Sequence, residues 1–309
     1  MSRPLRIRLF HEGSTAVSRV LGVQGWYLCP ICGRRFDEGA ALAGELTLEH
    51  VPPRAVGGRG LVLTCRDCNS QTGHSIEAEL SRREENRRFG EFMLGDEPEY
   101  ERHVILNIDG EPVRVAVDKS GGSNRTTFRI LGDSNDPAAV ERVAAYMSRL
   151  AEHGDPTGTT FTVGSGVPYQ PRLARVAELK AAFLVSFAKY GYRYALSPPL
   201  VPVRSQLLSP DRRILPDRWM LRCEEKIESA MLLQVFAPRC LIVLWNGHGV
   251  VLPWMSVPEA CLTSVKDLSD ESGRLRVSGT PVPWPERLEL LLDREEGGSV
   301  PASESLAET

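Results

Sequence analysis

The chain has 309 residues, of which 42% are hydrophobic and 25% are charged, and its formal net charge is −3. This composition excludes wholesale disorder, and the near-neutral balance excludes a uniformly basic nucleic-acid-binding chain. No apolar run reaches the roughly 18–20 residues that span a bilayer, and the first ten residues lack the apolar stretch of a secretory signal. We therefore expect a cytoplasmic protein of about two domains with no membrane partner.

The first part of the chain divides into a lead-in and a cysteine-rich unit. Residues 1–25 form the lead-in, in which residues 6–10 are a candidate strand. Residues 75–89 contain no Gly or Pro and many helix formers, which predicts a helix. Gly95–Pro98 then predicts a break, so we expect the cysteine-rich domain to cover residues 26–94.

The remainder is expected to be a larger α+β domain over residues 95–293, followed by a disordered acidic tail over residues 294–309. Two hairpins are predicted at Asp109-Gly110 and Asn246-Gly247, since these dipeptides favour two-residue turns. The elements expected in this part are, in order, strands at 103–108, 113–117 and 126–131, a helix at 137–150, strand and loop at 155–170, a helix at 172–190, a connection at 197–217, and strands at 241–245 and 250–254.

Four of the seven cysteines form two C-x-x-C pairs, Cys29/Cys32 and Cys65/Cys68. This spacing lets two thiolates on one tight turn face the same ion, and two such pairs supply the four ligands of a tetrahedral Zn²⁺ site. A redox dithiol is the alternative, but a second pair favours structural zinc. The other three cysteines lack such spacing and are expected to be core thiols: Cys223, Cys240 and Cys261.

The 32 residues between the pairs contain the other informative segment. Leu46, Leu48 and His50 alternate with Thr47 and Glu49, which predicts a short strand that Pro52 ends. A second strand is expected at residues 61–64, and Asn69 then opens a helix. The expected order is therefore strand, loop, strand and helix, held together by zinc.

This pattern resembles the HNH endonuclease superfamily, the ββα-metal nucleases, in its zinc-knuckle subtype. The family pattern is a C-x-x-C, an acidic residue followed by His-x-x-Pro, Gly-Gly, an apolar strand and C-x-x-C-Asn. The matching positions within about residues 26–90 are Cys29, Cys32, Glu49, His50, Pro53, Gly57, Gly58, Cys65, Cys68 and Asn69.

The resemblance implies a role for each matching polar residue. His50 matches the general base that activates water, and an imidazole with an ordinary pKa near 6.5 can accept a proton at neutral pH. Glu49 matches the acidic ligand of a catalytic divalent ion, and Asn69 matches the helix residue that completes that site. Mg²⁺ or Mn²⁺ suits these oxygen ligands, so the catalytic ion is distinct from the zinc.

Four further residues bear on this site. His74 is a candidate for contact with metal or phosphate, Glu77 is a weaker candidate ligand on the same helix, and Arg54 is placed to contact a substrate phosphate. The chain departs from the family at Gly60, where many members carry an Asn that braces the loop presenting the histidine. The brace must then come from elsewhere.

The resemblance implies a metal-dependent endonuclease that hydrolyses phosphodiester bonds in DNA, with RNA left open as a substrate. A restriction or phage-defence role follows from family analogy alone. The alternative is a non-catalytic zinc-knuckle protein that binds nucleic acid. Retention of Glu49, His50 and Asn69 together argues against that alternative, because binding alone needs none of them. The sequence does not determine the oligomeric state.

Overall fold

A computed structural model places most of the chain. It describes residues 3–94, 102–108, 111–118, 127–153, 162–164, 168–216, 219–222, 230–236, 239–245, 247–255 and 277–294. The chain forms two compact units, one made of residues 1–81 with 170–309 and the other of residues 82–169. This division differs from the expected sequential one, because the segment from residue 170 onward packs with the N-terminal segment. Each unit mixes helices with antiparallel strands, so the expected α+β class is confirmed.

The lead-in is a helix, α1 (Arg3–Leu21), and the expected strand at residues 6–10 is wrong. The buried positions of α1 recur every three to four residues, which is the period of a helix face and not of a strand. They are Leu9, Phe10, Gly13, Ser14, Ala16 and Val17. Because this face is buried against the cysteine-rich segment, the lead-in is part of the first unit.

The cysteine-rich segment contains the expected strand–loop–strand–helix order. Strands β3 (Leu46–Val51) and β4 (Arg59–Cys65) pair antiparallel, and helix α3 (Arg66–Thr72) follows directly. The other elements of this segment are β1 (Tyr27–Leu28), β2 (Arg35–Phe36), α2 (Glu38–Ala43), η1 (Arg54–Val56), the π-helical turn η2 (Gly73–Glu77) and α4 (Ala78–Leu94). The helix expected at 75–89 is thus confirmed, although it begins within a π turn.

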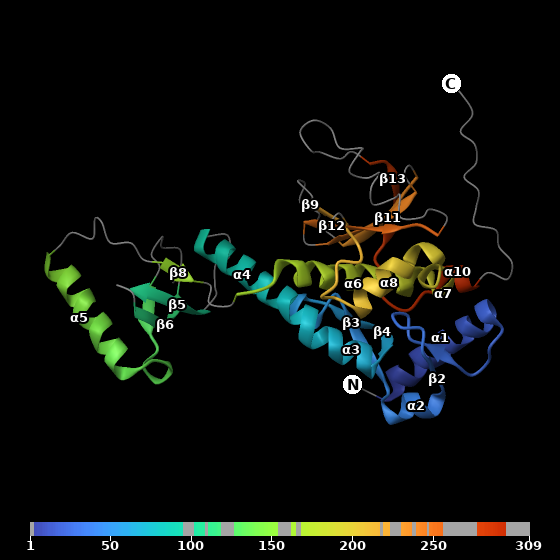
Figure 1. Ribbon diagram of the computed structural model, residues 1–309, viewed down its shortest axis with the longest axis horizontal. Coiled ribbons are helices and arrows are strands. Elements are labelled where there is room, and N and C mark those ends of the chain that lie inside the picture. Colours follow the sequence, from blue (N-terminus) through green and yellow to red (C-terminus); the bar gives the residue numbers. More distant parts are fainter. Residues whose placement is uncertain are drawn as a thin grey trace, which may run out of the picture. The chain divides into compact units, whose positions relative to one another are not determined.

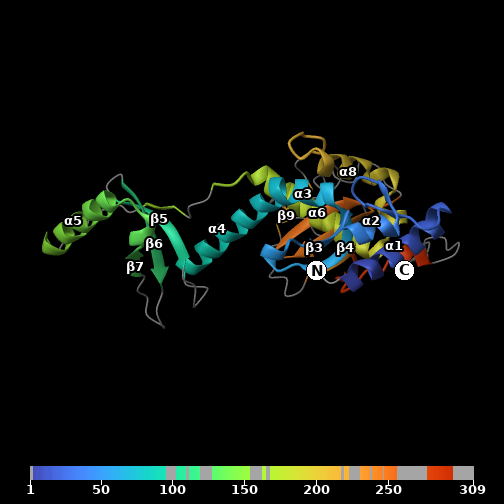
Figure 2. The ribbon, with the colours of Figure 1, turned by 90° about the horizontal axis from the view of Figure 1, so that it is seen from below.

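Helix α6 (Pro171–Tyr190) is the central element of the first unit. Pro171 begins it and Gly191, with φ of 92°, ends it. Every residue from Val176 to Tyr190 is buried, because the helix is covered on all sides. It lies between the pair β3–β4 and a five-stranded sheet (Figure 1). Figure 2 views the same unit from the side of β3 and β4.

The five-stranded antiparallel sheet has the order β13-β10-β11-β12-β9. Its strands are β9 (Met220–Arg222), β10 (Met231–Val235), β11 (Cys240–Trp245), β12 (His248–Pro253) and β13 (Gly279–Pro283). Pairing of β11 with β12 confirms the second predicted hairpin, and Gly247 has the positive φ that its turn requires. Cys240 is buried as expected, whereas Cys223 and Cys261 lie outside the described residues.

Residues 197–217, expected to be a connection, contain helical turns, so that interpretation is wrong. The turn η4 (Pro198–Leu200) leads into α8 (Val201–Leu208), and the prolines occupy first-turn positions, where a missing N–H costs nothing. The short helices α7 (Tyr192–Ala195) and α10 (Leu291–Arg294) complete the described part of this unit. None of the described helices combines the length and apolarity needed to cross a membrane.

The second unit is a four-stranded antiparallel sheet of order β7-β6-β5-β8 with one long helix. Its elements are β5 (Arg102–Ile108), β6 (Glu111–Asp118), β7 (Thr127–Ile130), η3 (Gly132–Ser134), α5 (Pro137–His153) and β8 (Thr162–Gly164). The hairpin, the third strand and the helix predicted here are confirmed. Three other expectations lie wholly or almost wholly outside the described residues: the break at 95–98, the loop at 119–124 and the tail from 294.

Candidate active site and metal centre

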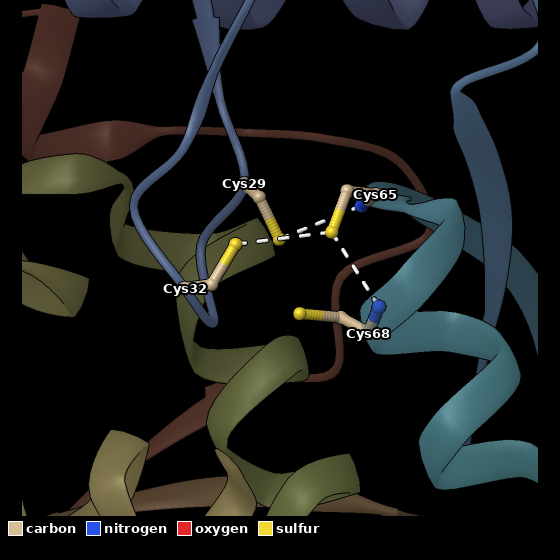
Figure 3. A group of neighbouring side chains, drawn as sticks. All are labelled: Cys29, Cys32, Cys65 and Cys68. Atoms are coloured by element: carbon tan, nitrogen blue, oxygen red, sulfur yellow. Dashed lines mark hydrogen bonds between the residues drawn. The ribbon is translucent and has the colours of Figure 1, made fainter.

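The four cysteines of the two C-x-x-C pairs meet at one point. Their sulfurs all lie within 4.8 Å of one another, and Figure 3 shows them pointing toward a common centre. Cys29 and Cys32 lie on the turn that follows β1, and Cys65 and Cys68 lie at the start of α3. Among the described residues, these four cysteines form the group of potential ligands that lie close enough together to hold a metal ion.

The distances fit zinc. Tetrahedral Zn²⁺ with Zn–S bonds of about 2.3 Å places its sulfur ligands about 3.8 Å apart. The sulfurs of Cys32 and Cys65 are 3.8 Å apart. The four thiols are free, and three of them are buried, as expected for a closed structural site. The cluster is therefore compatible with the predicted structural zinc.

The backbone around the cluster is shaped for thiolate ligands. Gly33 adopts φ of 74°, which a residue with a side chain rarely does, and its N–H donates to the Cys29 carbonyl at 2.8 Å. The N–H of Cys65 donates to the Cys29 sulfur at 3.5 Å, and that of Cys68 donates to the Cys65 sulfur at 3.4 Å. These donors stabilise negative charge on sulfur.

A cation also contacts the cluster. The guanidinium of Arg34 donates to the Cys65 sulfur at 3.1 Å and to Asp67 at 2.6 Å. The neighbouring sulfur of Cys29 lowers the pKa of Cys65 to about 6. Hydrogen-bond donors and a cation next to a sulfur favour its thiolate, which is the form that binds metal.

His50 lies near the end of β3. A register shift between Glu49 and His50 interrupts the pairing with β4, so that Glu49 faces Val62 and His50 faces Gly60. The strict alternation expected along this strand therefore stops at Glu49. The side chain of His50 is half-buried, so water has access to it. A bulge of this kind redirects a side chain at the end of a strand.

Glu49, in contrast, is buried, with only 3% of its surface exposed. Its Oε2 accepts a hydrogen bond from Thr64 at 3.1 Å, and its Oε1 accepts one from Lys180 at 2.9 Å. Burial raises the pKa of Glu49 to about 7, although the ammonium of Lys180 opposes this shift. The carboxylate is thus held in place by one residue of β4 and one of α6.

Lys180 is the residue of this site that the sequence analysis missed. It comes from α6, is 2% exposed, and also donates to Glu77 and, at 2.7 Å, to Thr72. Burial lowers the pKa of Lys180, but the carboxylates of Glu49 and Glu77 outweigh burial and raise it. Its position in the sequence could have identified it. Lys180 follows Val176 by four residues, so it is a charged residue on the apolar face of the predicted helix.

Asn69 lies beside the same face of β3 as Glu49. Its side-chain amide donates to Thr47 at 2.8 Å, and Thr47 precedes Glu49 by two residues on the strand. His74 is exposed, whereas Glu77 is half-buried against Lys180. The regular helix assumed for His74 and Glu77 is not present, because both residues belong to the π turn η2. Glu77 therefore lies with Glu49, since both pair with Lys180, whereas the side chain of His74 is exposed to solvent.

The loop after His50 has two informative positions. A Cβ at Gly60 would lie 2.2 Å from Leu48 Cδ2, so an asparagine could not occupy this place unless Leu48 moved. Leu48 therefore fills the space next to Gly60. Arg54, the candidate phosphate contact, is exposed on η1.

The comparisons with known proteins bear on this same segment. Residues 29–85 match a family model described as HNH endonuclease, which confirms the resemblance expected from the motif. No curated protein and no solved structure matches the chain. The matched segment contains both cysteine pairs together with Glu49, His50 and Asn69, and it ends well before Lys180.

Proposed function

From the match of residues 29–85 to the HNH endonuclease family, we propose that this protein is a metal-dependent endonuclease that hydrolyses phosphodiester bonds in DNA. One observation carries the proposal. His50, whose imidazole is accessible, directly follows Glu49 on β3, and the carboxylate of Glu49 is buried and fixed by hydrogen bonds. Asn69 donates a hydrogen bond to Thr47 of the same strand. This supports the proposal, because metal-assisted hydrolysis requires a base together with oxygen ligands.

His50 acts as the general base. It accepts a proton from a water molecule, which then attacks the phosphorus while the 3′ oxygen departs. Glu49 and Asn69 would hold one Mg²⁺ or Mn²⁺ ion, which would supply a positive charge to stabilise the departing oxygen. Arg54, exposed on the loop that follows His50, contacts a phosphate of the substrate. His74 and Glu77 remain secondary candidates for the same site.

Structural zinc in the four-cysteine cluster would take no part in the reaction. It would join the turn after β1 to the start of α3, the helix that carries Asn69. Restriction or phage defence would be a consistent setting, and RNA is the alternative substrate.

The test is cleavage of supercoiled plasmid by zinc-loaded protein, with and without added Mg²⁺ or Mn²⁺. We expect the wild type to nick or linearise the plasmid only with added metal, and His50→Ala to be inactive with normal zinc content. His11→Ala is the matched control, because His11 is an exposed histidine of the same unit on α1. Equal cleavage by His50→Ala and the wild type would reject the base assignment.

If the wild type binds DNA but cleaves neither DNA nor RNA, the non-catalytic zinc-knuckle alternative replaces the nuclease. The occupied space at Gly60 would then explain the loss, because the usual brace of the histidine loop is missing.

A further inference from the structure

We propose that Lys180 is a positioning residue of the nuclease site, which holds Glu49 in its orientation from outside the segment that matches the HNH family. This inference rests on the proposed function. The HNH segment then supplies the reacting groups, while α6 supplies the cation that fixes one of them.

The hydrogen bonds of Lys180 are complete. A protonated lysine has three N–H donors. Each has an acceptor here, namely Glu49 Oε1 at 2.9 Å, Thr72 Oγ1 at 2.7 Å and Glu77 Oε1. Because Lys180 is 2% exposed, water does not compete for these donors. The ammonium therefore has one defined position.

The three acceptors belong to three different elements of the HNH segment, since Glu49 lies on β3, Thr72 on α3 and Glu77 on η2. One ammonium thus joins the strand that carries His50 to the helix that carries Asn69. With Thr64 bound to the second oxygen of Glu49, both carboxylate oxygens are fixed, and so is the plane of the carboxylate. Each oxygen still has one lone pair for a metal ion.

The charges around Lys180 also suit a metal cation next to Glu49. Two carboxyl groups, those of buried Glu49 and half-buried Glu77, share the one ammonium of Lys180. A divalent ion next to Glu49 would favour the ionised form of both carboxyl groups, because an opposite charge stabilises a carboxylate.

The experiment compares full-length Lys180→Met with Lys189→Met. Lys189 is a matched control, because it lies on the same helix, is buried, and pairs with Glu289 at 2.7 Å, as part of a different cluster. Four quantities are measured for each protein: plasmid cleavage, Mn²⁺ affinity by electron paramagnetic resonance, zinc content and thermal stability.

We expect Lys180→Met to lower kcat for cleavage at least about tenfold, because Glu49 without the ammonium keeps its metal ion in an unproductive orientation. Its Mn²⁺ affinity should rise about tenfold or more, because a positive charge next to the ion is removed. Lys189→Met should keep wild-type kcat and Mn²⁺ affinity even where it loses stability. A purely structural role of Lys180 would not produce opposite changes in cleavage and metal affinity.

If Lys180→Met does not fold, the double variant Lys180→Met/Glu77→Gln removes one carboxylate charge together with the ammonium. It should fold, retain zinc and still cleave at least about tenfold more slowly than Glu77→Gln alone. Unchanged cleavage in the folded variants, or parallel losses in Lys180→Met and Lys189→Met, would overturn the proposal. A wild type that cleaves nothing refutes the proposed function instead. In that case the Mn²⁺ titration still tests the role of Lys180. Equal Mn²⁺ affinities of the wild type and Lys180→Met would show that Lys180 has no effect on Glu49.

Discussion

Gly58 is the position at which a single methyl group should disturb the candidate active site most directly. A Cβ at this residue would lie 1.4 Å from the carbonyl oxygen of Pro52, and real Cβ atoms essentially never approach below 3.0 Å. The two backbone segments must therefore move apart by about 1.6 Å, the difference between these distances. Pro52 follows His50 by two residues, so this displacement reaches the proposed general base.

The cost can be estimated from the loop that must open. Three backbone hydrogen bonds hold residues 53–58: Val56 to Pro53 at 2.9 Å, Gly57 to Arg54 at 3.1 Å and Gly58 to Pro53 at 3.2 Å. At about 1 kcal/mol each, their loss gives about 3 kcal/mol, the upper end of the usual range for overpacking. A misplacement of about 1 Å costs about 100-fold in rate, so we expect Gly58→Ala to cleave about 100-fold more slowly.

The assay is urea unfolding together with plasmid cleavage by Gly58→Ala. Gly73→Ala is the control, because Gly73 is helical and a Cβ there would meet nothing within 4 Å. The control should be neutral or stabilised by up to about 1 kcal/mol, since Ala favours helices more than Gly does. If Gly58→Ala unfolds at the wild-type urea concentration and cleaves at the wild-type rate, the steric argument for this loop is refuted.

Three further predictions concern the metal, the packing and the pH dependence. Cys65→Ser should lose its zinc and unfold the cysteine-rich segment, since metal binding supplies about 10 kcal/mol or more to such sites; one stoichiometric zinc by atomic absorption would contradict this. Gly13→Ala should destabilise the protein by about 1–3 kcal/mol in urea unfolding, because its Cβ would lie 2.3 Å from the buried ring of Tyr27, and an unchanged midpoint would count against this packing. Burial raises the pKa of Asp293 to about 6, so between about pH 4 and pH 6 the folded state keeps a proton that the unfolded state has released, and stability falls as pH rises. Stability measured across this window should therefore decrease less steeply with pH in Asp293→Asn, and identical slopes would show that Asp293 does not contribute.

Local chemistry in the sequence was sufficient for much of the site. Two C-x-x-C pairs predict a four-sulfur cluster, because the spacing forces two thiolates onto one turn wherever the pairs meet, and the sulfurs do converge. The two hairpins followed from their turn dipeptides, and α6 followed from its apolar period and its closing glycine. These features depend on residues near one another in the chain.

Other features depended on partners distant in sequence. The short window of residues 6–10 predicts a strand, although the apolar spacing of the lead-in over a longer window is helical. The resemblance predicts Glu49 as an acidic ligand next to His50, but the partners that fix its carboxylate are Thr64 and Lys180, the latter 131 residues away. No short-range pattern determines such a contact.

The sequence by itself determined which side chains are available to the proposed function: four thiols, an imidazole, a carboxylate and an amide. Only the tertiary structure decided how that chemistry is held. The chain leaves the first unit at residue 82 and returns at residue 170, and the returning helix places an ammonium between two carboxylates of the HNH segment. Periodicity indicates that a helix has a face to bury, whereas the partner of that face is selected by packing and charge over the whole fold.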